Sequence, residues 1–497
     1  MSMRLVAQVL AAALGLGLLG DWLLGEIGIG LNLFLGLGAL MASAAVLVRF
    51  HGQSTPAIVH PLMLLPPLVG LGVLWRSAPG LGAANVVALA VVLSLPVLRM
   101  GGVRLPLARL VDYAGGFAAT GLRTLLGPLH LISANVPWQE AFGGLRRRRT
   151  ASILVGLLIA MPLLLVFSAL FASADAGFEH AVQSIFALDF ESLFEHGFRA
   201  GLIGWISCGY LMAALSGVGV PSERWSVQER PKLGALELGI PLVALTVLFT
   251  AFVVMQAEYV FGGQQLVQSS EGLGYAEYAR RGFFELVAVS VLVLPVLLGA
   301  NWLTCATDPI SCRVVRGLSG GLLVPLGLIM MSAFHRLWIY VDAYGLTDSR
   351  VYAAAVLLWA GAAIAWLGVT VLRSRAERFA FGAMASAFAV LVALNVSNPD
   401  ALVVRVNLAR AESGAELDVP YLASLSADAA PALASVLGFE AVPGVLSKDD
   451  VCHLRGELER RWGDEEAPDW RSWSLARARA RRAVTLLGMA GGEASCG

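Results

Sequence analysis

Charged residues are scarce in this chain. Asp, Glu, Lys and Arg make up 14% of its 497 residues, whereas an ordinary soluble domain has about 25%. Hydrophobic residues make up 57%, and they gather in long runs. A run of about 18 or more apolar residues is long enough to cross the hydrocarbon of a bilayer as a helix. The composition therefore excludes an ordinary soluble protein and predicts an integral membrane protein.

Familiar nucleotide-binding and metal-binding motifs are also missing. The chain has neither a G-x-x-x-x-G-K-[ST] phosphate loop nor an H-E-x-x-H metal motif. Among its five cysteines, Cys305 and Cys312 have no second pair or His close by to complete a zinc set. We therefore expect no cofactor and no metal site. Cys452 and Cys496 both lie near the C-terminus, and their positions alone leave a disulfide between them open.

Apolar stretches of spanning length predict an all-α, polytopic transmembrane bundle of about eleven spans. The third and fourth stretches are the weakest, because they are short and contain prolines. We expect spans near residues 5–20, 29–48, 61–75, 81–98, 152–171, 199–217, 236–256, 283–304, 319–340, 351–372 and 379–396. The chain is thereby divided into N-terminal transmembrane helices (1–98), a basic cytoplasmic amphipathic loop (99–150), a main transmembrane domain (151–396) and an extracytoplasmic tail (397–497).

The basic residues predict the orientation. If the N-terminus is cytoplasmic, the inner loops hold 18 basic residues and the outer loops hold five, as the positive-inside rule requires. An odd number of spans then places the C-terminus outside. The segment 99–150, which ends in the run Arg146 to Arg149, either lies on anionic lipids of the inner leaflet or serves only to fix the orientation. Nothing in the charge distribution indicates a nucleic-acid partner.

The tail after residue 396 predicts a small helical extramembrane module. Ser447 and Asp450 have the spacing of a capping box at the start of one helix. A second helix is expected after Asp469, carrying Trp470 and Trp473 and continuing through several arginines. Its Arg and Trp side chains rest on lipid headgroups, bind an anionic polymer or simply form a solvated face, and the module as a whole is a candidate surface for a protein partner.

Polar residues at the expected outer ends of the spans predict an outward-facing polar site. Arg336 and Tyr340 share a helix face because they are four residues apart. Arg336 either pairs with Glu285, which lies at a similar depth, or reaches the headgroups alone, as a long Arg near a helix end can do. The full set of candidates is Asp175, Gln256, Glu258, Tyr259, Arg280, Arg281, Glu285, His335, Arg336, Tyr340, Tyr344, Arg350 and Asn395.

Five segments on the same expected side carry a family resemblance: SADAGF (173–178), QAEYVFGG (256–263), YAEYARRGFFEL (275–286), RLWIYVDAYGLTDSR (336–350) and NPDALVVRVN (398–407). Together they resemble an uncharacterised family of bacterial multipass membrane proteins, described only as a domain of unknown function. The resemblance covers about residues 150–430, and YARRGFFEL and AYGLT are its most specific parts. It implies an integral membrane protein of bacteria, and it supplies no activity, substrate or catalytic residue. We expect the chain to lie in the bacterial cytoplasmic membrane.

Three classes of function are compatible with these features. A transporter or permease-like protein for a polar or anionic solute or a lipid headgroup needs many spans, broken helices and a polar site. A membrane sensor or assembly component would use the outer tail to receive a signal or a partner. A membrane enzyme acting on a lipid-linked substrate would use a carboxylate or His as acid or base, although the spacing singles out none of them.

Overall fold

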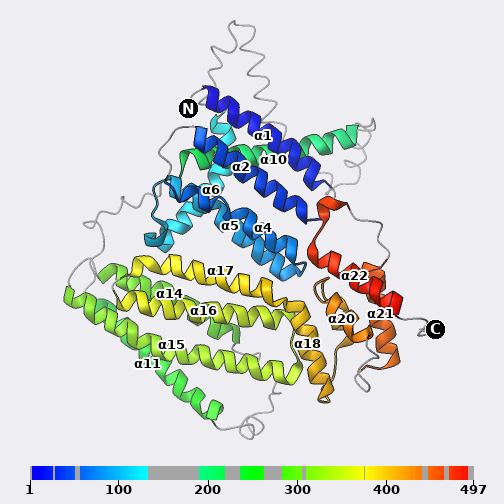
Figure 1. The fold of residues 1–497 in the computed structure, drawn as a ribbon. Helices are drawn as coiled ribbons and strands as arrows, with labels where there is room; N and C mark the ends of the chain where they lie inside the picture. Colours follow the sequence, from blue (N-terminus) through cyan, green and yellow to red (C-terminus); the bar gives the residue numbers. More distant parts are fainter. Residues whose placement is uncertain are drawn as a thin grey trace, which may run out of the picture. The chain divides into compact units, whose positions relative to one another are not determined.

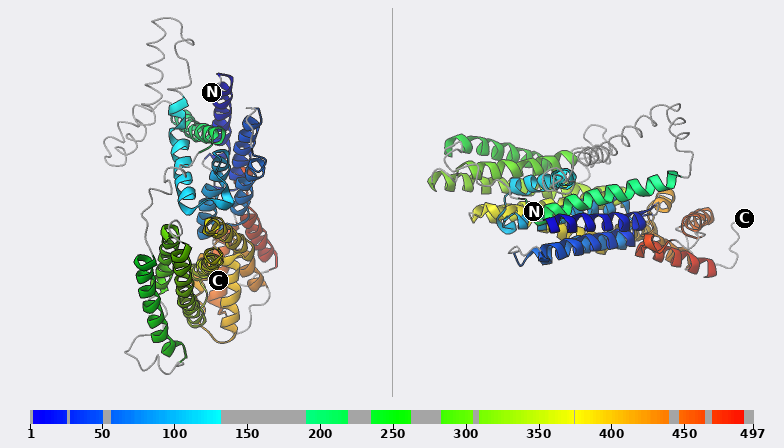
Figure 2. Two further views of the ribbon diagram at one scale, coloured as in Figure 1. Left: turned by 90° about the vertical axis from the view of Figure 1, so that its left-hand side faces the viewer. Right: turned by 90° about the horizontal axis from the view of Figure 1, so that it is seen from above.

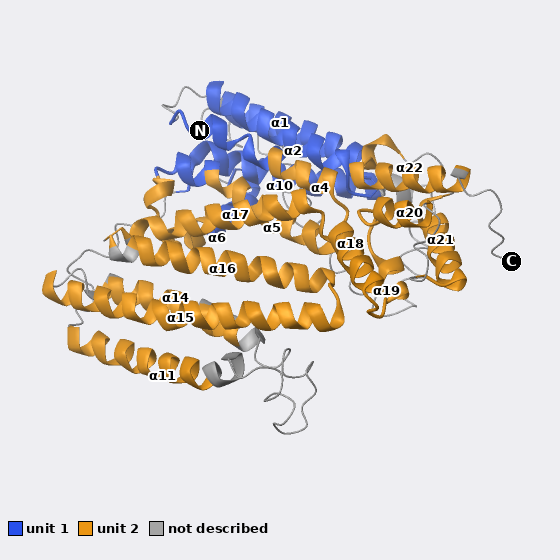
Figure 3. Ribbon diagram, turned by 60° about the horizontal axis from the view of Figure 1, so that its bottom comes forward, with its two compact units in different colours: residues 1–67, 96–102, 117–218 blue, residues 68–95, 103–116, 219–497 orange. Residues whose placement is uncertain are grey.

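The fold is helical throughout the residues that the computed structural model describes (Figure 1). These are residues 3–25, 28–50, 56–131, 190–218, 235–261, 283–304, 309–373, 375–438, 446–463 and 469–490. They contain no β-strand, so the predicted all-α class is confirmed. The chain forms two compact units, residues 1–67, 96–102 and 117–218, and residues 68–95, 103–116 and 219–497 (Figure 3).

Eight helices in the described residues are long and apolar enough to cross a membrane. They lie in α1 (Met3–Leu24), α2 (Leu31–Phe50), α5 (Pro79–Met100), α10 (Phe190–Ser216), α11 (Ala235–Phe261), α15 (Pro309–Tyr344), α16 (Asp348–Leu372) and α17 (Phe379–Ser397). Two further expected spans are shorter apolar stretches, one in α3 (Val59–Leu62) and α4 (Leu65–Trp75) and one in α14 (Phe283–Thr304). The remaining expected span, 152–171, lies outside the described residues. The chain is therefore an integral membrane protein.

The first unit is held together by close contacts between helix backbones. Helix α1 packs along α10, and both contact α2 (Figure 2). A Cβ added at Gly17 of α1 would overlap the carbonyl oxygen of Ala200 in α10. The absence of a side chain at such positions lets two helices approach closely, which is how membrane helices gain packing energy without a hydrophobic driving force.

Polar side chains join the same two helices at one end. The Asp21 carboxylate of α1 lies 2.8 Å from Nδ1 of His196 and 3.5 Å from Nε of Arg199 in α10. Residues 117–130 of α6 (Leu110–His130) also belong to this unit. The Trp205 indole N–H of α10 donates to the Leu125 carbonyl of α6 at 2.8 Å. This helix lies within the predicted loop 99–150, whose residues 132–150 are outside the described ranges.

The second unit contains a layer of long helices around an apolar core. Helix α15 packs against α11, α14 and α16, and α16 packs against α17 (Figure 1). Leu297, Leu322, Leu326 and Leu367 lie in this core and are fully buried. Helix α15 has 36 residues, or about 54 Å at 1.5 Å per residue. It is therefore longer than the expected span 319–340 and extends beyond a hydrocarbon layer of about 30 Å.

Short helices after α17 form the C-terminal module, defined here as residues 398–490. They are α18 (Pro399–Glu412), α19 (Val419–Ser424), α20 (Ala430–Gly438), α21 (Lys448–Trp462) and α22 (Leu475–Ala490). Leu422, Leu433, Leu454 and Ala480 form its apolar core. The same core includes Val351 from the first turn of α16, so the module and this span end share one apolar cluster.

The ends of the module helices test the predictions for the tail. Ser447 and Asp450 form the expected capping box, in which each side chain accepts from the other residue's backbone N–H. The prediction of a helix carrying Trp470 and Trp473 is wrong, because Trp470 begins a 3-10 turn (η5, Trp470–Ser472) and α22 begins only at Leu475. The Asp469 side chain caps that turn by accepting from the Arg471 N–H. Cys452 takes part in a disulfide bond, whereas Cys496 lies outside the described residues.

Candidate functional site

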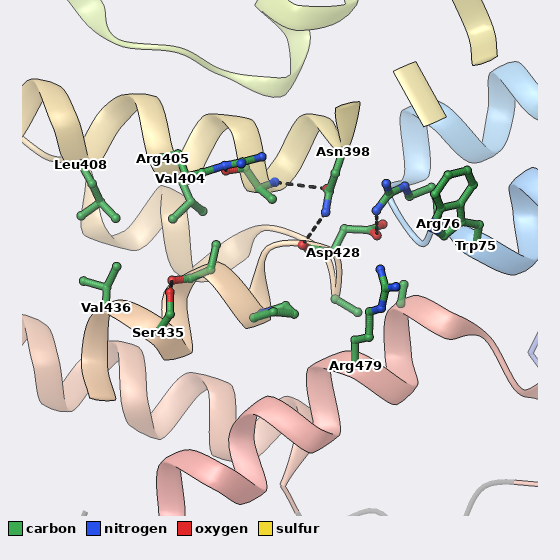
Figure 4. Close-up of a pocket in the computed structure, with 15 residues that line it drawn as sticks. Trp75, Arg76, Asn398, Val404, Arg405, Leu408, Asp428, Ser435, Val436 and Arg479 are labelled. Carbon is green, nitrogen blue, oxygen red and sulfur yellow. Dashed lines mark hydrogen bonds and ion pairs between the residues drawn. The ribbon is translucent and has the colours of Figure 1, made fainter. Parts of the chain in front are cut away.

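A buried ion pair joins the membrane helices of the second unit to the C-terminal module. Nη1 of Arg76, in the turn after α4, lies 3.3 Å from Oδ1 of Asp428, in the loop before α20 (Figure 4). The two side chains are only 6% and 2% exposed. A pair of charges this deeply buried is stable only if the remaining donors and acceptors also find partners.

The surrounding groups supply those partners. The Asp428 carboxylate accepts from the Ser77 N–H at 2.6 Å and from the Ala78 N–H at 3.1 Å. Nε of Arg76 donates to the Asn395 carbonyl at 2.6 Å, and Nη2 donates to the Val396 carbonyl at 3.2 Å. These are carbonyls of the last turn of α17, which have no partner within the helix itself. One ion pair therefore binds both the segment that leads into α5 and the last turn of α17.

Two asparagines complete this network. The Asn85 and Asn395 side chains exchange two hydrogen bonds of 3.2 and 3.1 Å. Asn398 has a φ of 53° and caps α18 by accepting from the Ala401 N–H. Its side-chain N–H also donates to the Asp428 carbonyl at 3.1 Å. The left-handed conformation, which Asn adopts more readily than most residues, turns the chain directly from span α17 into the module. Below, the Arg76 network means Arg76, Asp428, Asn85, Asn395 and Asn398.

A second set of hydrogen bonds holds the turn between α15 and α16 against the module. Asn407 of α18 pairs with both the N–H and the carbonyl of Leu346, each at 2.7 Å. Gly345 has a φ of 80°, and a Cβ there would meet the side chains of Asn407 and Arg410. Only Gly combines that backbone conformation with this close approach. This explains why Gly stands at the centre of the AYGLT segment.

The module contributes a Tyr and a buried carboxyl next to this turn. The Tyr421 hydroxyl accepts from the Asp348 N–H at 2.9 Å and lies 3.2 Å from the Asp348 carboxylate. Burial raises the pKa of Tyr421 to about 12, so the hydroxyl keeps its proton at neutral pH. Burial also raises the pKa of Asp400, whose carboxylate accepts from the Ser426 N–H at 3.0 Å.

The structure brings some of the predicted site residues together. The Tyr340 and Tyr344 rings are 5.2 Å apart, and the Arg350 guanidinium lies 4.2 Å above the Tyr340 ring. Arg350 also donates to the carbonyls of Tyr344 and Gly345. Asn395 belongs instead to the Arg76 network. On α15, His335 is exposed and Arg336 is half-buried.

Other predicted site residues fall outside the description. These are Asp175, Arg280 and Arg281, together with the side chains of Gln256, Glu258, Tyr259 and Glu285, whose backbones lie in α11 and α14. The pairing of Arg336 with Glu285 therefore stays a prediction, as does a shared site that includes them.

One segment has the G-x-S-x-G spacing of a hydrolase nucleophile turn, from Gly317 to Gly321. That motif works only where a strand turns sharply into a helix and exposes the Ser. Here the segment lies within the continuous helix α15, and Ser319 is fully buried and donates to the Val315 carbonyl at 2.7 Å. The geometry therefore excludes Ser319 as a nucleophile of this kind.

The matched family covers most of the chain, including the span ends and part of the module described above. Residues 62–436 match the family described as "Domain of unknown function (DUF4153)". The chain belongs to the DUF4153 family. That range includes both Arg76 and Asp428, and it confirms the resemblance to an uncharacterised family. Comparisons with the curated proteins and with the solved structures gave no match, so the function has to be argued from this DUF4153 structure itself.

The sequence analysis missed Arg76, Asn85, Asn398, Asp400 and Asp428. Two signals point to the ion pair. Arg76 is one of the few basic residues on an expected outer loop, where the charge bias disfavours them, and Asp428 stands in the otherwise apolar stretch ADAAPALA. Neither signal identifies the partner, because 352 residues separate the two side chains.

Proposed function

We propose that this DUF4153 protein is a membrane receptor or assembly component of the bacterial cytoplasmic membrane, with its N-terminus inside and its C-terminal module outside. The observation that carries the proposal is the Arg76 network. Through it, Asp428 of the module binds the turn between α4 and α5, and Arg76 of that turn binds the end of α17. A ligand or partner that moves the loop at Asp428 would therefore act on the turn between α4 and α5 and, through Arg76, on the end of α17.

The turn between α15 and α16 supports the same function. Asn407 and Tyr421 of the module bind Leu346 and Asp348 at that turn. The ends of α4, α15 and α17 were all expected on the outer side, and each contacts the module. Coupling between two sites requires an element that both can bias, and the module is positioned to serve as one.

The polar groups inside the described spans give less support to a transport path. The buried hydroxyls of Ser290, Ser319 and Thr370 donate to carbonyls of their own helices, and the helix layer of the second unit packs around Leu residues. A transporter is expected to present polar groups to its cargo near the bilayer midplane. We therefore rank transport of an anionic solute or lipid headgroup second and a lipid-linked enzyme third.

The proposal is tested in cells that lack the gene. We expect the deletion strain to show a changed proteome without the accumulation or loss of one metabolite or lipid class. The full chain carrying R76M/D428N should reproduce the deletion phenotype at normal protein level, because the charged link between module and spans is gone, whereas the exposed pair variant E457Q should restore the wild type. A single accumulated compound class would instead assign a transporter, and a single missing product class would assign an enzyme.

A further inference from the structure

A pocket lies beside the Arg76 network, between the module helices and the turn after α4. Its volume is about 400 Å³, and its walls come from α18, α20 and α22 together with Trp75 and Arg76 (Figure 4). A volume of this order is within the range of small-molecule sites, about 300–1,000 Å³. The pocket is therefore large enough for a headgroup-sized ligand.

The charges that line the pocket are mainly positive. Arg405 of α18 and Arg479 of α22 come from facing walls, and Arg479 points toward the Arg76–Asp428 pair (Figure 4). The one lining carboxylate, Asp428, is already bound by Arg76 and by the backbone N–H groups of Ser77 and Ala78. Within the described residues, Arg405 and Arg479 form no ion pair. Nε of Arg405 donates to the Ala401 carbonyl of its own helix at 3.2 Å. The terminal Nη groups of Arg405 and the Arg479 guanidinium thus remain for an anionic ligand.

Most of the remaining lining is apolar, with Asn398 and Ser435 as its polar side chains. Val404 and Leu408 of α18 face Val436 of α20 (Figure 4), and Ala476 of α22 also lines the pocket. The pocket also lies at the level where the membrane spans end, because Arg76 binds the last carbonyls of α17 and Trp75 ends α4. Trp and Arg are typical of the headgroup region of a bilayer.

We propose that this pocket binds the phosphate of a lipid headgroup, with Arg405 and Arg479 contacting the phosphate oxygens and the apolar wall receiving the part of the lipid next to it. Guanidinium groups match phosphate geometry and form two parallel hydrogen bonds with it. The inference rests on the proposed receptor function, and it names the class of ligand that the module would receive.

The test uses the purified full chain in a nonionic detergent and measures binding by calorimetry. The probes are water-soluble dihexanoyl phosphatidylglycerol, inorganic phosphate and octyl glucoside, which has a chain and no phosphate. We expect the phosphatidylglycerol to bind, inorganic phosphate to bind more weakly, and octyl glucoside not to compete. R405Q and R479Q should each weaken lipid binding about tenfold, as for one lost charge-assisted contact.

The matched control is R482Q. Arg482 is also exposed on α22 and is not part of the pocket lining, so the variant has the same net charge as R479Q and should bind like the wild type. Equal weakening by R482Q and R479Q, or no binding to the folded protein, would overturn the site. Inorganic phosphate that binds as tightly as the lipid would overturn the lipid as the source. A failure of the lipid-binding test does not affect the receptor proposal, which rests on the Arg76 network. The phenotype of R76M/D428N tests the receptor proposal separately.

Discussion

Replacing Asp428 with Asn is expected to lower the free energy of unfolding by about 3–5 kcal/mol, because it leaves the Arg76 guanidinium buried without a counter-charge. The Arg76 side chain is 6% exposed, so water cannot replace the lost partner. Asn keeps an oxygen that can accept from the Ser77 and Ala78 N–H groups, which confines the change to the charge. R76M should be similarly damaging, since it leaves the carboxylate buried. Denaturant unfolding of the full chain in detergent measures both.

The double variant R76M/D428N measures how much of the loss in each single variant comes from the interaction between Arg76 and Asp428. Because it leaves neither charge buried without its partner, we expect it to lose less stability than either single variant, which corresponds to a coupling of about 3 kcal/mol or more. The exposed pair Arg460 and Glu457 is the control, and E457Q should leave the unfolding midpoint unchanged, since exposed pairs contribute little. A coupling of zero would show that Arg76 and Asp428 do not interact in the folded protein.

The second large effect is expected at a helix contact of the first unit. A Cβ added at Gly209 of α10 would overlap the backbone carbonyl of Thr124 in α6. Because a carbonyl oxygen cannot move aside as a flexible side chain can, G209A should separate the two helices and cost about 1–3 kcal/mol or more. Thermal unfolding of the variant in detergent should show a clearly lower midpoint.

Gly201 gives a control on the same helix. A Cβ at Gly201 would meet no atom within 4 Å, so G201A should be neutral or slightly stabilising, as expected for Gly to Ala in a helix interior. If G209A were as stable as G201A, the close contact between α6 and α10 would be absent from the protein in detergent.

The sequence predicted features that depend on neighbouring residues. The expected spans correspond to helices wherever the chain is described, because twenty apolar residues in a row determine a spanning helix locally. The capping box of Ser447 and Asp450 was predicted for the same reason, since its two side chains are three residues apart. The start of α22 was misplaced because the Asp469 side chain caps a 3-10 turn at that point, a local alternative that the Trp and Arg pattern does not distinguish.

The candidate site depends on contacts between residues that are far apart in the sequence, and it was predicted only in part. Tyr340 and Tyr344 lie at the end of α15 and Arg350 lies in the first turn of α16, only six residues later, and the structure brings them together. Asn395 was selected because it ends a span, but its partner Asn85 lies 310 residues away. Arg76 and Asp428 each carry a local signal, but only the fold of the module makes them a pair.

The central claim is that the module and the ends of α4, α15 and α17 lie together on the outer side of the membrane. The most direct measurement labels single introduced cysteines with a membrane-impermeant maleimide on intact cells. Ser349, after the turn between α15 and α16, Ser413, in the module, and Arg375, between α16 and α17, are all exposed. We expect S349C and S413C to be labelled and R375C to be labelled only after the membrane is opened. Labelling of S349C and S413C from opposite sides, or of R375C alone in intact cells, would contradict the account.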